Sequence, residues 1–214
     1  MSVKISPSVL TSDFLELGRD IKRLEKAGAD MLHLDVMDGI FVPNISFGPA
    51  VIKSIRKHST VPLDVHLMID RPHRYLKEFS EFADYLGFHY EAGSDVAETL
   101  LEIRKLGCKS CLTIKPCTAA EEIFDFLPLC DMVLVMSVEP GFGGQKFLVS
   151  ALDKLRALKK EITDKGYNIL LEVDGGINKQ TASDAVKAGA DVLVAGSFLF
   201  SGDMEQNIAY LKNL

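Results

Sequence analysis

The chain has 214 residues, of which 47% are hydrophobic and 25% charged, a composition typical of a globular protein with a sizeable core. The net charge is -6 and the basic residues form no cluster, which argues against nucleic acid as a partner. No apolar run approaches the ~18 residues of a membrane-spanning helix, and the first residues lack the apolar core of a secretion signal. We therefore expect a cytoplasmic protein that does not bind membranes, with its four cysteines reduced.

Short apolar runs alternate with amphipathic stretches along the whole chain. The runs are rich in valine, isoleucine and leucine, as is typical of parallel strands covered on both faces. In chain order they are VKISPSVL (3–10), MLHLDVM (31–37), LDVHLMI (63–69), YLGFHY (85–90), KSCLTI (109–114), MVLVMSV (132–138), ILLEVDG (169–175) and DVLVAGS (191–197). Helices are predicted between them, for example over 13–28, where Phe14, Leu17, Ile21 and Leu24 share one face, and over 95–107 and 150–162.

A repeated turn indicates that these units share one architecture. The pentapeptide KAGAD occurs at 26–30 and again at 187–191, each time where a helix ends at a glycine and a strand begins. Eight such strand–helix units without a linker predict an α/β fold, a single (β/α)8 TIM barrel domain over residues 1–214. The turn after the first run contains no glycine, which argues against an open dinucleotide-binding sheet.

Ionisable side chains occur in three of the predicted strands, where burial without partners would cost several kcal/mol, roughly. His33 and Asp35 share one strand face, and His66 and Asp174 lie in two other strands. If these faces point inward, the four side chains meet at the C-terminal end of the barrel, where such enzymes carry out their chemistry. Two imidazoles and two carboxylates suit one divalent metal ion, which could be Zn²⁺, Fe²⁺, Mn²⁺ or Co²⁺.

Other ionisable residues are interpreted differently. Taken singly, a buried histidine is more often a hydrogen-bonded core residue than a ligand, so the metal hypothesis depends on the group of four. Asp38 follows its strand and is expected to make turn hydrogen bonds, while Asp64 begins its strand and is interpreted as structural and distant from the chemistry. His58, His73 and His89 are left out of the predicted site.

Glycine-rich turns follow the last three predicted strands. Glycine lets backbone N–H groups approach an anion closely, and barrels of this class often bind phosphate at these loops. The loop after the sixth strand is long enough to act as a lid. Met37, Met68 and Met136 each end a strand and are predicted to form an apolar floor, although core filling is the simpler reading. The predicted phosphate-side contacts are Gly141, Phe142, Gly143, Gly144, Gly175, Gly176, Gly196 and Ser197.

At the level of longer motifs, the chain resembles the ribulose-phosphate 3-epimerase family almost end to end. The motifs are SPSVL, HLDVMDGIFVPNISFGP, LDVHLMI, MSVEPGFGGQKF, EVDGGIN and VAGS. The resemblance implies a homo-oligomeric isomerase of the pentose phosphate pathway that interconverts D-ribulose 5-phosphate and D-xylulose 5-phosphate. It implies one divalent metal ion bound by His33, Asp35, His66 and Asp174, an acid/base role for both aspartates, and substrate contacts from Ser8 and His66.

The chemistry of epimerisation agrees with this assignment. One proton must leave the carbon next to the ketone, and another must return on the opposite face. Asp35 and Asp174 come from well-separated strands, and we expect the first ionised and the second protonated for one direction of reaction. The metal ion would contact the ketone oxygen and the neighbouring hydroxyl and would stabilise the enediolate.

Four alternatives remain open from the sequence. A sister epimerase acting on a six-carbon sugar such as D-allulose 6-phosphate would use the same residues. A Schiff-base aldolase would need a lysine at a strand end, where Lys115 lies. A related decarboxylase would need a lysine at the position of Met37, which argues against that activity. A sugar-phosphate sensor could bind the same ligand without catalysis.

Overall fold

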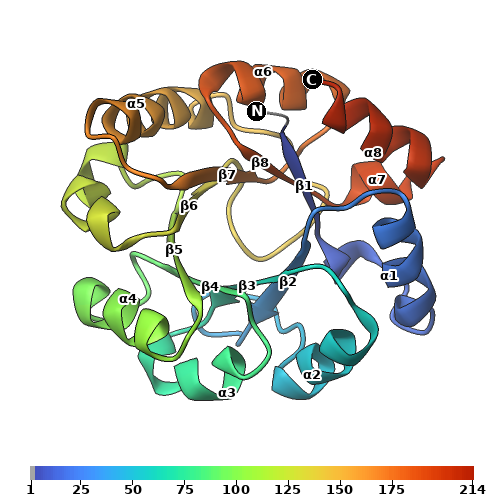
Figure 1. Cartoon of the computed structure of the whole chain (residues 1–214), viewed down its shortest axis with the longest axis horizontal. Coiled ribbons are helices and arrows are strands. Elements are labelled where there is room, and N and C mark those ends of the chain that lie inside the picture. Colours follow the sequence, from blue (N-terminus) through green and yellow to red (C-terminus); the bar gives the residue numbers. More distant parts are fainter. Residues whose placement is uncertain (1–2) are drawn as a thin grey trace.

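The computed structural model describes residues 3–214 and shows a nearly closed barrel of parallel strands inside a ring of helices (Figure 1). The predicted TIM barrel fold is therefore confirmed. The strands are β1 (Lys4–Pro7), β2 (Leu32–Met37), β3 (Leu63–Met68), β4 (Tyr85–His89), β5 (Lys109–Ile114), β6 (Met132–Met136), β7 (Leu170–Asp174) and β8 (Val192–Ala195).

Helices follow the strands as the alternating pattern predicts. The α-helices are α1 (Leu17–Lys26), α2 (Pro49–His58), α3 (Leu76–Ser80), α4 (Val96–Lys105), α5 (Ala151–Asp164), α6 (Lys179–Ala188), α7 (Ser197–Phe200) and α8 (Met204–Lys212). The 3-10 helices are η1 (Val9–Thr11), η2 (Pro72–Arg74) and η3 (Ala120–Leu129). None of these helices is both long and apolar enough to cross a membrane.

The order of the strands brings distant parts of the sequence together. Parallel ladders run β1-β8-β7-β6-β5-β4-β3-β2, and an isolated bridge between Ser8 and His33 links the two ends of this order. All carboxyl ends of the strands therefore lie at one end of the barrel, as parallel pairing requires. This arrangement gathers the residues that end the strands around one opening.

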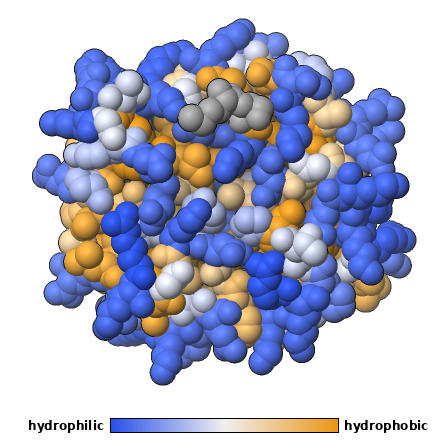
Figure 2. Space-filling view, viewed as in Figure 1, coloured by the Kyte–Doolittle hydropathy of each residue, from blue (hydrophilic) through white to orange (hydrophobic). Residues whose placement is uncertain are grey.

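Alternation along each strand separates the apolar core from the polar interior. In β2, Leu34 and Val36 belong to the same buried apolar cluster as Ile21 and Leu24 of α1. Because side chains alternate along a strand, His33 and its neighbours two residues on face the inside of the barrel. A hydrophilic layer covers much of the face seen in Figure 2, with apolar side chains showing between the polar ones.

Local predictions were confirmed in the turns and corrected in two helices. Gly28 and Gly189, in the two KAGAD segments, have φ of 96° and 111°, the left-handed conformation expected where these helices end. The first helix begins only at Leu17, because Asp13 accepts a hydrogen bond from the Leu15 N–H and forms a turn, which leaves Phe14 exposed. In the fifth unit a 3-10 helix takes the place of an α-helix.

Candidate active site

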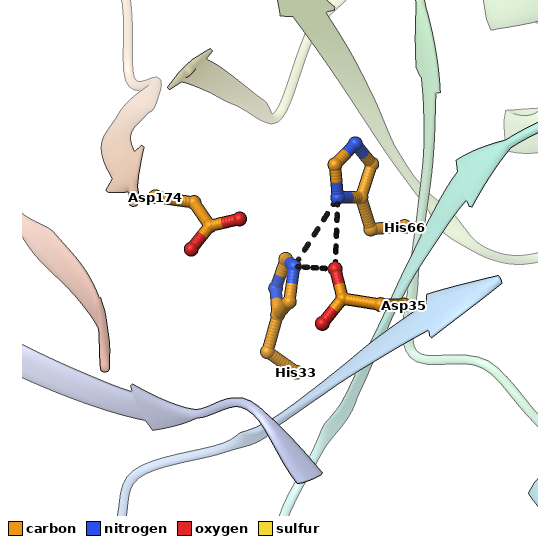
Figure 3. A group of neighbouring side chains, drawn as sticks. All are labelled: His33, Asp35, His66 and Asp174. Carbon is orange, nitrogen blue, oxygen red and sulfur yellow. Dashed lines mark hydrogen bonds and ion pairs between the residues drawn. The ribbon is translucent and has the colours of Figure 1, made fainter. Parts of the chain in front are cut away.

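The four predicted ligand residues lie together at the carboxyl end of the barrel (Figure 3). The ladder between β2 and β3 pairs Asp35 with His66, which places their side chains next to each other. His33 Nε2 lies 3.3 Å from His66 Nδ1 and 3.3 Å from Asp35 Oδ1, and His66 Nδ1 lies 3.4 Å from the same oxygen. Asp174 completes the group from β7, and one ligand atom of each residue lies within 4.8 Å of the others.

The separations among the His33, Asp35 and His66 atoms match those of ligands around one divalent metal ion. An ion bound at about 2.0–2.1 Å in tetrahedral geometry separates its ligand atoms by roughly 3.3–3.4 Å. His33 Nδ1 lies 2.5 Å from Asp64 Oδ2, and because an ionised carboxylate only accepts, Nδ1 carries the proton. His33 Nε2 therefore faces the other three residues and is the ring atom that would bind a metal ion after losing its proton. Burial lowers the pKa of His33, but the charges of Asp64 and Asp35 outweigh it and raise the pKa well above its ordinary value.

The two aspartates sit in contrasting electrostatic surroundings. Burial raises the pKa of Asp35, but the charge and hydrogen bond of His33 outweigh it and hold the pKa well below its usual range. Ser8 Oγ adds a hydrogen bond of 2.6 Å to Asp35 Oδ2. Burial and the nearby charge of Asp35 raise the pKa of Asp174 to about 7. At neutral pH one carboxyl is therefore ionised, while the other is poised to bind or release a proton.

Three buried groups next to the four residues were misplaced or missed by the sequence analysis. Asp64, interpreted as distant from the chemistry, contacts His33 because the β2–β3 ladder pairs the two residues. Glu172 is fully buried, and burial raises its pKa well above the usual range. His89, left out of the predicted site, is fully buried with its Nε2 2.9 Å from His66 Nε2. Its signal was a His-x-Glu pair at the end of a strand, the same spacing as His33 and Asp35.

A cavity opens above this cluster at the mouth of the barrel. The predicted contacts that line it are Ser8, Asp35, Met37, Met68, Met136, Gly141, Phe142, Gly143, Gly144, Asp174, Gly175, Gly176, Gly196 and Ser197. His33 and His66 lie beneath this lining and are almost completely inaccessible to solvent. Among the described residues, no lysine or arginine lines the cavity, so an anion bound there would contact backbone N–H groups and hydroxyls.

The glycine-rich turns on one side of the cavity are packed against each other. Gly176 has a φ of 64°, and a Cβ atom there would lie 2.5 Å from the Phe147 backbone nitrogen. Across the cavity mouth, the Asn44 side-chain amide donates to the Gly141 carbonyl at 2.7 Å. The close backbone packing therefore requires glycine at position 176 for a steric reason.

Lys115, the alternative Schiff-base lysine, has a different environment. Its Nζ lies 3.8 Å from the centroid of the Phe41 ring. Lys115 is absent from the residues that line the cavity, whereas both aspartates line it. The geometry therefore favours carboxylate chemistry over chemistry by this amine.

Fold and site together define a (β/α)8-barrel enzyme with an imidazole–carboxylate centre at the carboxyl ends of its strands. A sequence profile described as "Ribulose-phosphate 3 epimerase family" matches residues 4–200. The chain belongs to this family, and with it to the isomerases.

Curated relatives support the assignment over nearly the whole chain. The ribulose-phosphate 3-epimerase of Bacillus subtilis is 46% identical over 216 residues, covering 98% of each chain. That of Escherichia coli is 43% identical and covers 92% of this chain and 88% of its own. Among solved structures, a 3-keto-L-gulonate-6-phosphate decarboxylase from Vibrio cholerae aligns with a TM-score of 0.74 at 14% identity, over 100% and 97% of the two chains. At that identity the likeness concerns the fold alone.

Proposed function

We propose that the protein catalyses the 3-epimerisation of D-ribulose 5-phosphate to D-xylulose 5-phosphate and the reverse reaction, with a divalent metal ion bound at the four-residue centre. The observation that carries the proposal is the pair of aspartates. Asp35 and Asp174 approach the centre from β2 and β7, and the pKa is low for Asp35 and about 7 for Asp174. The family assignment supports the reaction type.

In this mechanism the two carboxyl groups exchange protons with opposite faces of one carbon. Ionised Asp35 removes the proton from C3, and the electron pair of that C–H bond moves toward the C2 carbonyl to give an enediolate. Protonated Asp174 then returns a proton to C3 on the other face, which inverts that centre. The roles are reversed for the opposite direction, so each turnover leaves the pair ready for the reverse reaction.

The other residues of the site would bind the metal ion and position the sugar. His33, His66, Asp35 and Asp174 would hold the metal ion, which would supply positive charge beside the substrate oxygens where negative charge develops. Ser8 would keep Asp35 oriented through its hydrogen bond. Met37, Met68 and Met136 would exclude water from the intermediate. The glycine turns after β6, β7 and β8 would bind the phosphate through backbone N–H groups.

The sister activity on D-allulose 6-phosphate uses the same groups and is the second candidate. It differs in the length of sugar between the reacting carbon and the phosphate. By family membership we also infer a homo-oligomer that serves the pentose phosphate pathway.

The deciding experiment combines elemental analysis with kinetics on the purified protein. We expect about one equivalent of a divalent metal, loss of activity on chelation, and recovery when ions are added back. Turnover in D₂O should introduce deuterium at C3, and kcat/KM should favour the five-carbon over the six-carbon sugar. Activity that survives complete metal removal would contradict the metal site, and absence of C3 exchange would contradict the epimerase reaction.

A further inference from the structure

A line of buried groups extends away from the four-residue centre toward β4. His66 Nδ1 faces His33 and Asp35, while the other ring nitrogen of His66 points away from them (Figure 3). That nitrogen, Nε2, lies 2.9 Å from His89 Nε2. On the far side of this second ring, His89 Nδ1 lies 3.4 Å from Glu91 Oε2, within ion-pair distance, and neither atom has a hydrogen-bond partner among the described residues.

Chemistry fixes where the protons lie along this line. A carboxylate only accepts, so His89 Nδ1 must carry the proton that faces Glu91. A neutral His89 then has a lone pair on Nε2, which accepts from the N–H at His66 Nε2. A neutral His66 protonated at Nε2 has its lone pair on Nδ1, the atom that faces the metal centre.

We propose that Glu91 and His89 are positioning residues that lock His66 in the tautomer able to bind the metal ion. This inference rests on the proposed metal site. Asp64 does the same for His33 in a single step, whereas Glu91 acts on His66 through an intervening imidazole. Side chains that hydrogen-bond to the outer nitrogen of a metal-binding histidine typically contribute about 10–100-fold to metal affinity.

The surroundings of Glu91 and His89 hold the line in place. The Lys115 backbone N–H donates to Glu91 Oε1 at 2.9 Å, and the Thr118 hydroxyl donates to the same oxygen. The Phe41 ring lies 4.8 Å from the His89 ring, centroid to centroid, and His89 is fully buried. One oxygen of Glu91 is therefore fixed by donors from the loop after β5, which leaves the other oxygen for His89.

The substitution Glu91→Gln should reverse which atoms donate and which accept along this line of residues. The Lys115 N–H requires an acceptor, so the amide oxygen of glutamine would occupy the Oε1 position. The amide NH₂ would then face His89 Nδ1 and donate to it. His89 would carry its proton on Nε2, and His66 would be driven to protonate Nδ1, the proposed metal ligand.

Two measurements on the full chain test this inference. Nitrogen-15 NMR of the histidine rings in the metal-free protein should show His66 protonated at Nε2 in the wild type and at Nδ1 in Glu91→Gln. Affinity for Zn²⁺, measured by competition with a chromophoric chelator, should fall about 10–100-fold in Glu91→Gln. Glu122→Gln is the matched control because Glu122 accepts from the Ala119 N–H in the same region but does not contact His89. It should behave as the wild type does.

A second substitution keeps the test decisive if Glu91→Gln folds poorly. His89→Leu removes the acceptor for the His66 Nε2 proton, while His89→Gln supplies an amide oxygen in its place. We expect Zn²⁺ affinity to fall about 10–100-fold in His89→Leu and to be largely kept in His89→Gln. Unchanged affinity and an unchanged His66 tautomer in Glu91→Gln or in His89→Leu would overturn the proposal that Glu91 and His89 set the tautomer of His66. A wild type that binds no Zn²⁺ would instead overturn the metal site itself.

Discussion

The two sides of the barrel mouth are made from different chemical groups. On the side of β2, β3 and β4, the site consists of buried side chains that titrate or accept protons, including His33, Asp35 and His66. On the side of β6, β7 and β8, apart from Asp174 and Met136, it consists mainly of glycine turns whose backbone lines the cavity. The first side depends on the identity and tautomer of each side chain, and the second depends on how closely backbones can approach.

Substitutions on the two sides should therefore have different effects. Changes on the β2–β4 side should alter proton transfer and metal binding, and changes on the β6–β8 side should alter substrate binding and local stability. Asp174 is the exception, because it lies on the backbone side yet belongs to the proton-transferring pair.

The largest effect is expected for the two aspartates. Asp35→Asn and Asp174→Asn should each lower kcat by about 10²–10⁴ because each removes one acid/base group, and by more where metal is lost as well. Epimerisation kinetics and deuterium exchange at C3, with metal content measured in the same samples, check this. Near-wild-type turnover by Asp174→Asn would show that the backbone side holds no catalytic group.

Next in size is the effect of a methyl group on the backbone side. Gly176→Ala should destabilise the protein by about 1–3 kcal/mol through its left-handed backbone, with a further loss because its Cβ would meet the Phe147 backbone nitrogen at 2.5 Å. KM for the sugar phosphate should rise more than kcat falls. Denaturant unfolding and steady-state kinetics measure both effects.

Gly166→Ala is the control for that comparison. Gly166 has a φ of 67°, close to the 64° of Gly176, but no atom lies within 4 Å of a Cβ built there. It should show the backbone penalty alone, with KM unchanged. Equal effects of the two substitutions would mean that the close packing at Gly176 is unimportant.

The same contrast explains how much of the molecule the sequence predicted. Strand periodicity and the repeated helix-ending turn predicted the barrel, and alternation within HLDVM predicted that His33 and Asp35 share one face of their strand. Asp64 was interpreted as distant from the chemistry because it begins its strand. Its position in the sequence does not show that the β2–β3 ladder pairs it with His33. His89 and Glu91 were missed because their pair straddles the end of β4, and only the third dimension shows that His89 meets His66.

A smaller effect is expected for Glu91, the carboxylate next to His89, whose contribution to stability should depend on pH. Burial raises the pKa of Glu91, but His89, Thr118 and the Lys115 N–H together lower it to about 2, below its ordinary value of 4.5. A depressed pKa contributes stability that is complete above about pH 4.5 and is lost as the pH falls toward 2. Allowing for solvent screening, metal-free Glu91→Gln should be about 1–2 kcal/mol less stable than the wild type at pH 7.

Denaturant unfolding at several pH values measures that difference. The gap between the two proteins should shrink steadily between pH 4.5 and 2, because protonated Glu91 is as neutral as the amide. A gap that stays constant with pH would mean that the loss comes from packing rather than from charge.

The smallest effect is expected for Lys115. It contacts Phe41 near the β2–β4 side of the mouth, but it does not take part in the proposed chemistry. Lys115→Met should leave kcat within about twofold and cost about 0.5–1 kcal/mol of stability, since it removes only the contact between the ammonium group and the Phe41 ring. Borohydride should trap no adduct of the wild type with substrate. Lys109→Met is a control at the start of β5, where the Lys109 Nζ lies 4.8 Å from the centroid of the Tyr85 ring and also donates to the Tyr85 hydroxyl at 3.1 Å. Unchanged activity and a small loss of stability in both variants would confine Lys115 to packing. A large loss of activity in Lys115→Met alone, together with a trapped adduct, would instead move the chemistry from the carboxylates to an amine, and the distinction between the two sides of the mouth would fail.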